Sequence, residues 1–147
     1  MRIRAARRDD FEAVTRLLEE LGRPRTLGEP DEAERRAVYE LQVVEPNTHH
    51  IVAEDDGSEV IAFASLHFRS RLNWANDEAW IPDLLVTERA RRAGVGRALL
   101  DEAQRRAREH GCHGLTLESG YQRAEAHHMY RQFGMRDAGK YFTKPLR

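Results

Sequence analysis

RRAGVGRALL, residues 91–100, lies at the junction of two different hydrophobic patterns. The mostly apolar run Ile81–Val86 before it is typical of a buried strand, and apolar residues recur after it at helical spacing. Gly94 and Gly96 stand at the junction, where glycine is typical of a tight turn. The first N–H groups of a helix have no partner within it and, together with the helix dipole, attract anions. The segment therefore predicts a strand-to-helix turn that holds an anion.

Three phosphate-binding patterns compete for this turn. A P-loop requires Lys followed by Ser or Thr after its last glycine, whereas this chain has Arg97 and Ala98 there. A dinucleotide-binding fingerprint requires a third small residue, but that position is Leu99. The third pattern, in which Gln or Arg is followed after two residues by Gly-x-Gly or Gly-x-Ala, is met by Arg91–Gly96. An ordinary turn, whose glycines serve only its geometry, is the alternative.

Strand-like segments lie on both sides of this turn. Strands are expected at Arg2–Ala5, His50–Glu54, Val60–Phe68, Glu78–Val86 and Leu115–Glu118, with one or two more within Met135–Pro145. Hairpin turns are expected at Asp55–Ser58 and near Asn73–Asp77.

Four segments have helical periodicity. The first is capped by Asp9 and Asp10, buries the side containing Phe11, Val14, Leu17, Leu18 and Leu21, and ends at Gly22. The second is expected to bury Val38, Leu41 and Val44 before Pro46. The third begins at the glycine turn and ends at Gly111. The fourth buries Ala126, Met129, Tyr130 and Phe133 and ends at Gly134.

These elements predict an α+β fold. We expect a mixed, mostly antiparallel central sheet of six or seven strands, flanked by about four helices. A length of 147 residues is that of one ordinary domain, so residues 1–147 are expected to form a single domain.

Composition and charge exclude several classes of function. The formal net charge is −1 from almost balanced acids and bases, so the composition does not indicate a basic face for nucleic acid or an anionic membrane. No apolar run approaches the roughly 20 residues that cross a bilayer. The single Cys112 cannot form an internal disulfide, and the chain opens without an apolar signal region. We therefore expect a reduced, cytoplasmic protein whose partners are small molecules or proteins.

The chain resembles the GNAT superfamily of acetyl-CoA-dependent N-acyltransferases. The resemblance rests on Arg91–Gly96, on Leu85-Val86 before it, and on the spacing Ala126-x-x-x-Tyr130-x-x-x-Gly134-Met135. It extends over essentially the whole chain and implies one GNAT-like N-acetyltransferase domain whose fourth and fifth strands splay apart.

The resemblance also implies how acetyl-CoA is held. Backbone N–H groups at the glycine turn bind the pyrophosphate without a metal, and the pantetheine arm pairs with the backbone of the fourth strand. Arg123 stands where many relatives have an asparagine that contacts pantetheine, although it could instead pair with Glu118. The residues expected to bind the cofactor are Leu84, Leu85, Val86, Arg91, Arg92, Ala93, Gly94, Val95, Gly96, Arg97 and Arg123.

Two residues are the candidates for catalysis. Tyr130 matches the family's tyrosine acid, which protonates the departing thiolate; its alternative role is that of a core aromatic. Polyamine and amino-sugar acetyltransferases often carry Glu-Asp in the fourth strand, and here the pair reads Pro82-Asp83. Asp83 is therefore expected to hold the acceptor's cation or orient a water, or else to cap backbone groups around a bulge caused by the proline.

Further polar and aromatic residues are weaker candidates. His67 and Glu118 are alternative bases, while adjacent His127 and His128 point in different directions and lack the spacing of a metal pair. Trp74 and Trp80 either wall an acceptor pocket, pack at an exposed edge or form a homodimer contact, and the region 23–46 is a second candidate for the pocket wall.

The predicted function is transfer of the acetyl group of acetyl-CoA to a primary amine by direct attack in a ternary complex. The acceptor, a small molecule or a protein amine, stays open. An acyl-cysteine route is disfavoured because Cys112 is far along the chain from Asp83 and Tyr130. The alternative, suggested by the loss of the expected glutamate at Pro82, is a non-catalytic acyl-CoA-binding module.

Overall fold

The computed structural model describes all residues from Met1 to Arg147. Its strands are β1 (Arg2–Ala5), β2 (Thr48–Glu54), β3 (Val60–Arg69), β4 (Glu78–Val86) and β5 (Gly114–Leu117). Its helices are α1 (Phe11–Glu20), α2 (Glu32–Val44), α3 (Val95–His110) and α4 (Ala124–Gln132), with single 3-10 turns η1 (Arg8–Asp10) and η2 (Glu88–Ala90). None of the helices combines the length and the apolar character needed to cross a membrane. Two compact units, Met1–Thr116 and Leu117–Arg147, make up the chain.

The strands form one sheet in the order β1-β2-β3-β4-β5. Neighbouring strands from β1 to β4 are antiparallel. Helix α3 connects β4 to its neighbour β5, and the N–H of His113 donates to the carbonyl of Asp77 (3.0 Å), which joins the beginnings of these two strands. The connection is therefore a parallel crossover, and the expected mixed α+β sheet with four helices is confirmed.

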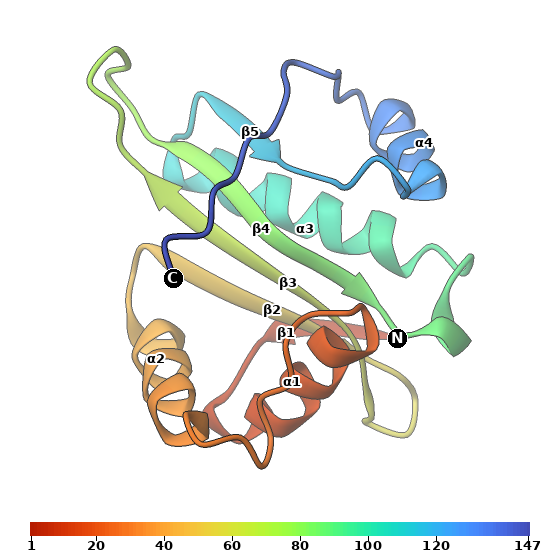
Figure 1. Ribbon diagram of the computed structural model, residues 1–147. Coiled ribbons are helices and arrows are strands. Elements are labelled where there is room, and N and C mark those ends of the chain that lie inside the picture. Colours follow the sequence, from red (N-terminus) through yellow and green to blue (C-terminus); the bar gives the residue numbers. More distant parts are fainter. The chain divides into compact units, whose positions relative to one another are not determined.

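Both faces of this sheet are covered. Successive residues of β2 and β3 are buried, and successive side chains of a strand point to opposite faces. Ala62 and Ala64 of β3 pack with Val95 and Leu99 of α3. Phe63, between those alanines, packs on the other face in a cluster with residues of α1. Figure 1 shows α1 and α2 on one side of the sheet and α3 on the other.

The expected sixth and seventh strands are absent, since the sheet has five strands and Met135–Pro145 contains no strand. This segment is rich in charged residues and contains Gly139, so its apolar side chains do not alternate as a half-buried strand requires. Tyr141 and Phe142 are exposed. Without an apolar face to bury, the segment gains too little to order as a strand.

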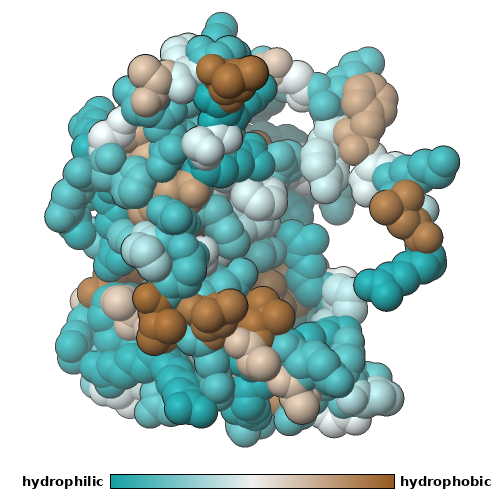
Figure 2. Space-filling model, turned by 90° about the vertical axis from the view of Figure 1, so that its left-hand side faces the viewer, coloured by the Kyte–Doolittle hydropathy of each residue, from teal (hydrophilic) through white to brown (hydrophobic).

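Helix α2 buries a different side from the one expected. Val38, Leu41 and Val44 were expected to face the core, but they are 55%, 65% and 78% exposed, and Tyr39 is the buried residue of the helix. The larger aromatic ring prevails: it packs 5.5 Å from Phe11 between ring centroids, and its hydroxyl donates to the carbonyl of Arg7 (2.6 Å). Figure 2 views the side where α2 lies and shows apolar side chains gathered on that surface.

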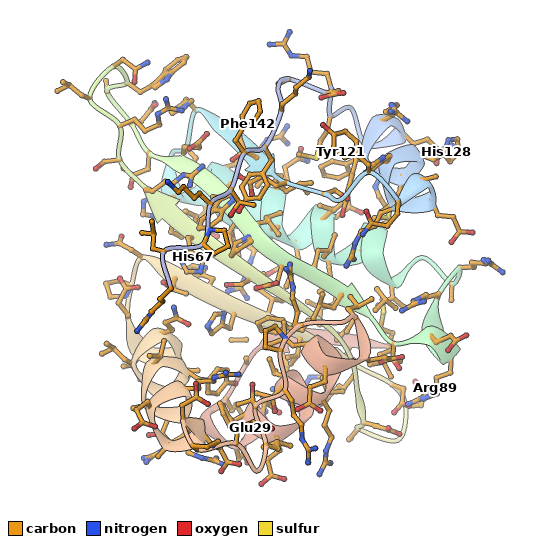
Figure 3. The ribbon with its side chains drawn as sticks, in the orientation of Figure 1. Glu29, His67, Arg89, Tyr121, His128 and Phe142 are labelled. Atoms are coloured by element: carbon orange, nitrogen blue, oxygen red, sulfur yellow. The ribbon has the colours of Figure 1, made fainter.

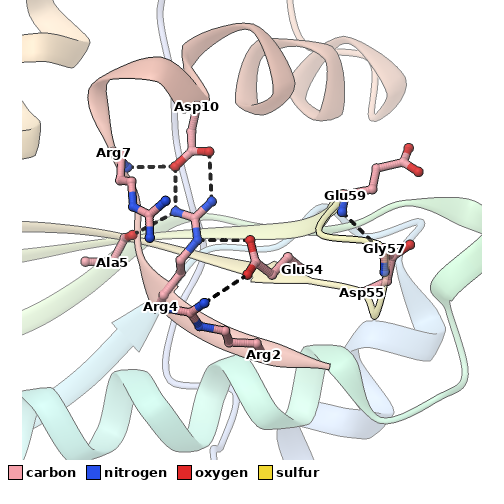
Figure 4. Close-up of polar contacts among 9 residues, drawn as sticks. All are labelled: Arg2, Arg4, Ala5, Arg7, Asp10, Glu54, Asp55, Gly57 and Glu59. Carbon is pink, nitrogen blue, oxygen red and sulfur yellow. Dashed lines mark hydrogen bonds and ion pairs between the residues drawn. The ribbon is translucent and has the colours of Figure 1, made fainter.

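A buried ion cluster joins β1, η1 and β2. The Arg4 guanidinium donates to both carboxylate oxygens of Asp10 (2.7 and 3.0 Å) and to Glu54 (3.0 Å), as Figure 4 shows. Asp10 also accepts from the N–H of Arg7 (2.7 Å) and makes no side-chain cap bond to α1, so the expected cap is replaced by this cluster. Burial alone raises the pKa of Asp10, yet Arg4 and Arg7 hold that pKa below its usual range.

His50 of β2 is the buried histidine between the sheet and α2. Its ring stacks on Tyr39, with centroids 5.6 Å apart, and its Nε2 bonds to Oε1 of Gln42 (2.8 Å). The Nδ1 atom is buried without a hydrogen-bond partner. Burial, with a smaller contribution from His67, lowers the pKa of His50 to about 4.

His50 should make the fold sensitive to mild acid. Its folded pKa of about 4 lies below the unfolded value of 6.5, so its neutral form stabilises the fold above pH 6.5, and this stability is lost as the pH falls from 6.5 toward 4. The loss by pH 4.5 is about 2–3 kcal/mol. We expect His50→Gln to reduce the fall in unfolding free energy between pH 7 and 4.5, measured by urea denaturation. His128→Gln, a change at an exposed histidine, is the control. Equal falls in wild type and His50→Gln would contradict the prediction.

Candidate active site

The turn between β4 and α3 is anchored from three directions. Nε of Arg91 donates to the carbonyl of Val86 (3.0 Å), which ties the turn to the end of its own strand. Glu20, at the end of α1, accepts from the N–H of Glu88 (2.9 Å). Arg89, labelled in Figure 3, bonds to Asp55 (3.0 Å) in the β2–β3 hairpin. The turn therefore has a defined position at one end of the sheet.

Left-handed residues shape the turn itself. Arg92 has φ 64° and Gly94, the residue before α3, has φ 82°. The first repeating hydrogen bond of the helix runs from the N–H of Ala98 to the carbonyl of Gly94 (3.0 Å), so the N–H groups at 95–97 precede the helical ladder. No side chain caps this end. Backbone amides in such a left-handed turn at a helix start form an anion-binding nest, which fits a pyrophosphate.

A β-bulge lies in the middle of β4, before the turn in the chain. His67 of β3 is opposite Trp80, and Ser65 is opposite Asp83, so the single β3 residue Leu66 faces two residues of β4, Ile81 and Pro82. Proline suits this position because the extra residue of a bulge needs no ladder N–H. The bulge turns Trp80 and Asp83 to the same face, although residues three apart in a regular strand face opposite sides.

A polar cluster occupies this face of the sheet beside the bulge. Oδ1 of Asp83 lies 3.1 Å from a guanidinium nitrogen of Arg23, and their side chains are 25% and 51% exposed. Oγ of Ser65 bonds to Nε2 of His67 (2.9 Å), whose ring centroid is 5.6 Å from that of Trp80. Figure 3 labels His67 on the sheet. The cluster brings together an acid, a base and an aromatic wall.

His67 in this cluster is suited to accept a proton. Burial lowers its pKa, and the carboxylates of Glu45 and Asp83 partly oppose that effect. Its pKa therefore lies below 6.5, and the imidazole is neutral at pH 7. A neutral imidazole can act as a general base without first losing a proton.

Tyr130 and Arg123 belong to the second unit, in and just before α4. Burial raises the pKa of Tyr130 above its ordinary value of 10, and the charge of Arg123 partly opposes the rise. The phenol is therefore protonated at neutral pH and able to donate. The approach of Tyr130 and Arg123 to Asp83 stays a prediction.

The other candidates have local partners. Nε2 of His127 bonds to Oγ of Ser119 (3.1 Å), and His128 is exposed on α4 in Figure 3. No three His, Cys, Asp or Glu side chains gather as a metal site would require. Trp74 stacks on His113, with centroids 4.0 Å apart. Burial raises the pKa of Cys112, which makes its thiol a weaker nucleophile at neutral pH.

Sequence reasoning did not single out two members of the polar cluster, Arg23 and Ser65, although Arg23 is the first residue of the region 23–46 that was expected as a possible pocket wall. Arg23 lies in the loop after α1, and no local pattern links that loop to β4. Ser65 did carry a signal, because it lies two residues before His67 in a strand and must share its face.

The matching family model is that of the Acetyltransferase (GNAT) family, which matches residues 13–135. An aminoalkylphosphonate N-acetyltransferase of Salmonella typhimurium is 31% identical over 144 residues, which cover 98% of this chain and 90% of the relative. An IAA acetyltransferase of Azospirillum brasilense is 29% identical over 131 residues, covering 88% and 81% of the two chains.

A solved structure supports the fold independently. Glucosamine-6-phosphate N-acetyltransferase of Arabidopsis thaliana superposes with a TM-score of 0.83 at 19% sequence identity, over 99% of this chain and 98% of that one. A sequence identity of 19% supports a shared fold and nothing more specific.

The left-handed turn yields a prediction at Gly94. A Cβ there would meet no atom within 4 Å, so the cost of substitution comes from φ 82° alone. We expect Gly94→Val to lower the unfolding free energy by about 1–3 kcal/mol, and Gly94→Asn to lower it less, because asparagine tolerates this conformation. Urea denaturation measures both. An equal loss in the two variants would show that side-chain size, rather than φ, sets the cost.

Proposed function

Because the chain belongs to the GNAT acetyltransferase family, we propose that it transfers the acetyl group of acetyl-CoA to the nitrogen of a small-molecule amine while both substrates are bound. The observation that carries the proposal is the left-handed amide nest directly after the bulged strand β4, with an acid and a base beside the bulge. Family membership supports acetyl-CoA as the acyl donor, whose thioester would supply the activated acetyl group.

The cofactor-binding residues divide into three groups in this proposal. The amides of the turn, from Arg92 to Arg97, hold the pyrophosphate, and Gly94 and Gly96 leave it room. Leu84, Leu85 and Val86 offer their strand backbone to the pantetheine arm, which adds as a strand would. The separation of β4 from β5 that this requires, and the contact of Arg123 with the arm, are parts of the proposal.

Chemistry then follows from the polar cluster. Asp83 holds the ammonium group of the acceptor beside the bulge, and His67 accepts the proton that the nitrogen must lose. The nitrogen lone pair forms the new C–N bond, the C–S bond breaks, and Tyr130 donates a proton to the departing sulfur. Cys112 takes no part, in agreement with its raised pKa.

The relatives support a small acceptor over a protein amine. The Salmonella relative is named for an aminoalkylphosphonate, a small molecule with an amine and an acidic group. We further propose that residues 1–147 form one catalytic domain and that it works in the cytoplasm. The homodimer stays a prediction.

Release of free thiol from acetyl-CoA over a panel of small amines tests the function. We expect thiol release that requires an amine, and a rise in melting temperature with CoA, equivalent to about 2.7 kcal/mol at 100 times Kd. Gly94→Val should lose most of that rise while remaining folded. A CoA-dependent rise without thiol release from any amine would support the non-catalytic alternative, and the absence of both would contradict the proposal.

Tyr130→Phe tests the proposed acid. The change removes the phenolic oxygen and keeps most of the ring's packing, so we expect kcat to fall by about 10²- to 10⁴-fold. CoA affinity, measured by calorimetry, should change less than about tenfold. A kcat within about threefold of wild type, with single-turnover kinetics showing that chemistry limits the rate, would leave Tyr130 only its packing role.

A further inference from the structure

We propose that Arg23 is a specificity residue that selects acceptors carrying an anionic group beside the amine. This inference rests on the proposed function and names the class of its acceptor: amino-carboxylates, amino-phosphonates and similar zwitterions. The structural basis is the ion pair between Arg23 and Asp83, 3.1 Å apart, at the bulge of β4.

The position of this pair relates it to the acceptor. Asp83 lies directly before Leu84–Val86, and its strand partner Ser65 is hydrogen-bonded to His67. Arg23 comes from the loop after α1 and extends to this point of the sheet. An amine held by Asp83 therefore lies beside a guanidinium as well as beside the proposed base.

The charge of the cluster favours a zwitterion. Arg23 and Asp83 balance each other, and His67 and His50 are neutral at pH 7 because their pKa values are lowered. A polyamine would bring a second cation toward Arg23, where like charges repel. A zwitterion instead offers one charge to each member of the pair and keeps the cluster balanced.

Arg23 and Asp83 can exchange each other for the charged groups of a substrate without leaving either charge unpaired. The backbone of Arg23 is fixed by a bond from its N–H to the carbonyl of Leu18 (3.0 Å), while its side chain is half exposed. A partly exposed ion pair contributes only modest stability, so its separation costs little when the substrate supplies a new partner for each charge. The substrate's ammonium replaces Arg23 at Asp83, and its anion takes the freed guanidinium, whose planar donor fork matches carboxylate and phosphonate oxygens.

A structural role for the pair makes a different prediction. If Arg23 only stabilised the loop after α1, its loss would affect all acceptors alike. A role in selection affects only acceptors with an anion. Acceptors of similar length that differ in their second group therefore separate the two roles.

The test compares four acceptors that share a primary amine and differ in their second group: β-alanine and 2-aminoethylphosphonate, in which this group is anionic, β-alaninamide, in which it is uncharged, and 1,3-diaminopropane, in which it is cationic. For wild type we expect kcat/KM to be higher for the two anionic acceptors than for the other two. Arg23→Gln should lower kcat/KM for the anionic acceptors by about 10- to 100-fold, mainly through KM, and leave or raise that for the amide and the diamine. Arg23→Lys should recover part of the loss, and Arg16→Gln, at an exposed position of α1, should change nothing.

The outcomes keep this inference apart from the proposed function. Thiol release with no preference for anionic acceptors, or an equal loss for all four in Arg23→Gln, overturns the role of Arg23 and leaves the acetyltransferase standing. If no acceptor gives thiol release, calorimetric titration of CoA-bound protein with 2-aminoethylphosphonate still decides: binding that Arg23→Gln abolishes supports selection by Arg23, and absence of binding overturns it.

Discussion

The extra residue in β4 is the constraint on which the polar cluster and the proposed chemistry depend. A regular strand would place Trp80 and Asp83 on opposite faces of the sheet, so only one of them could lie with Ser65 and His67. With Leu66 opposite two residues of β4, both come to the same face. Pro82 is therefore more than the loss of an expected glutamate: it stands within the bulge that sets the direction of the acidic side chain after it.

The same strand also continues into the left-handed turn that we propose to bind the pyrophosphate. Beyond the bulge, Leu85 rejoins the core under α1 while Leu84 and Val86 face α3, so the strand ends in regular alternation on both faces. The turn is then anchored to Val86, to the hairpin and to α1. One continuous segment thus contributes Trp80 and Asp83 to the polar cluster at its middle and forms the left-handed turn at its end.

Local patterns predicted the parts of the fold whose causes are local. The bounds of β1 and β4 agree with the expected ones, and Gly111 ends α3 in a left-handed conformation, as its position indicated. The prediction of the buried side of α2 was wrong because that side is set by the contact of Tyr39 with Phe11, which lies in another helix. The prediction of one or two final strands was wrong because apolar and polar residues do not alternate regularly in Met135–Pro145. The polar cluster combines residues from a loop and two strands. Its members within β3 and β4 follow local patterns, whereas the sequence indicated the loop only as the region 23–46 and gave no sign that Arg23 meets Asp83.

The buried ion cluster at Arg4 has a consequence for how the sheet is assembled. Sliding β1 along β2 by one residue would turn every side chain of β1 to the other face of the sheet. That slip would take both Arg2 and Arg4 away from Glu54 and leave this buried carboxylate without a cation. The ion cluster thus favours the correct alignment of β1 on β2, in addition to the packing of Ile3 against the cluster that contains Val95 and Leu99 of α3.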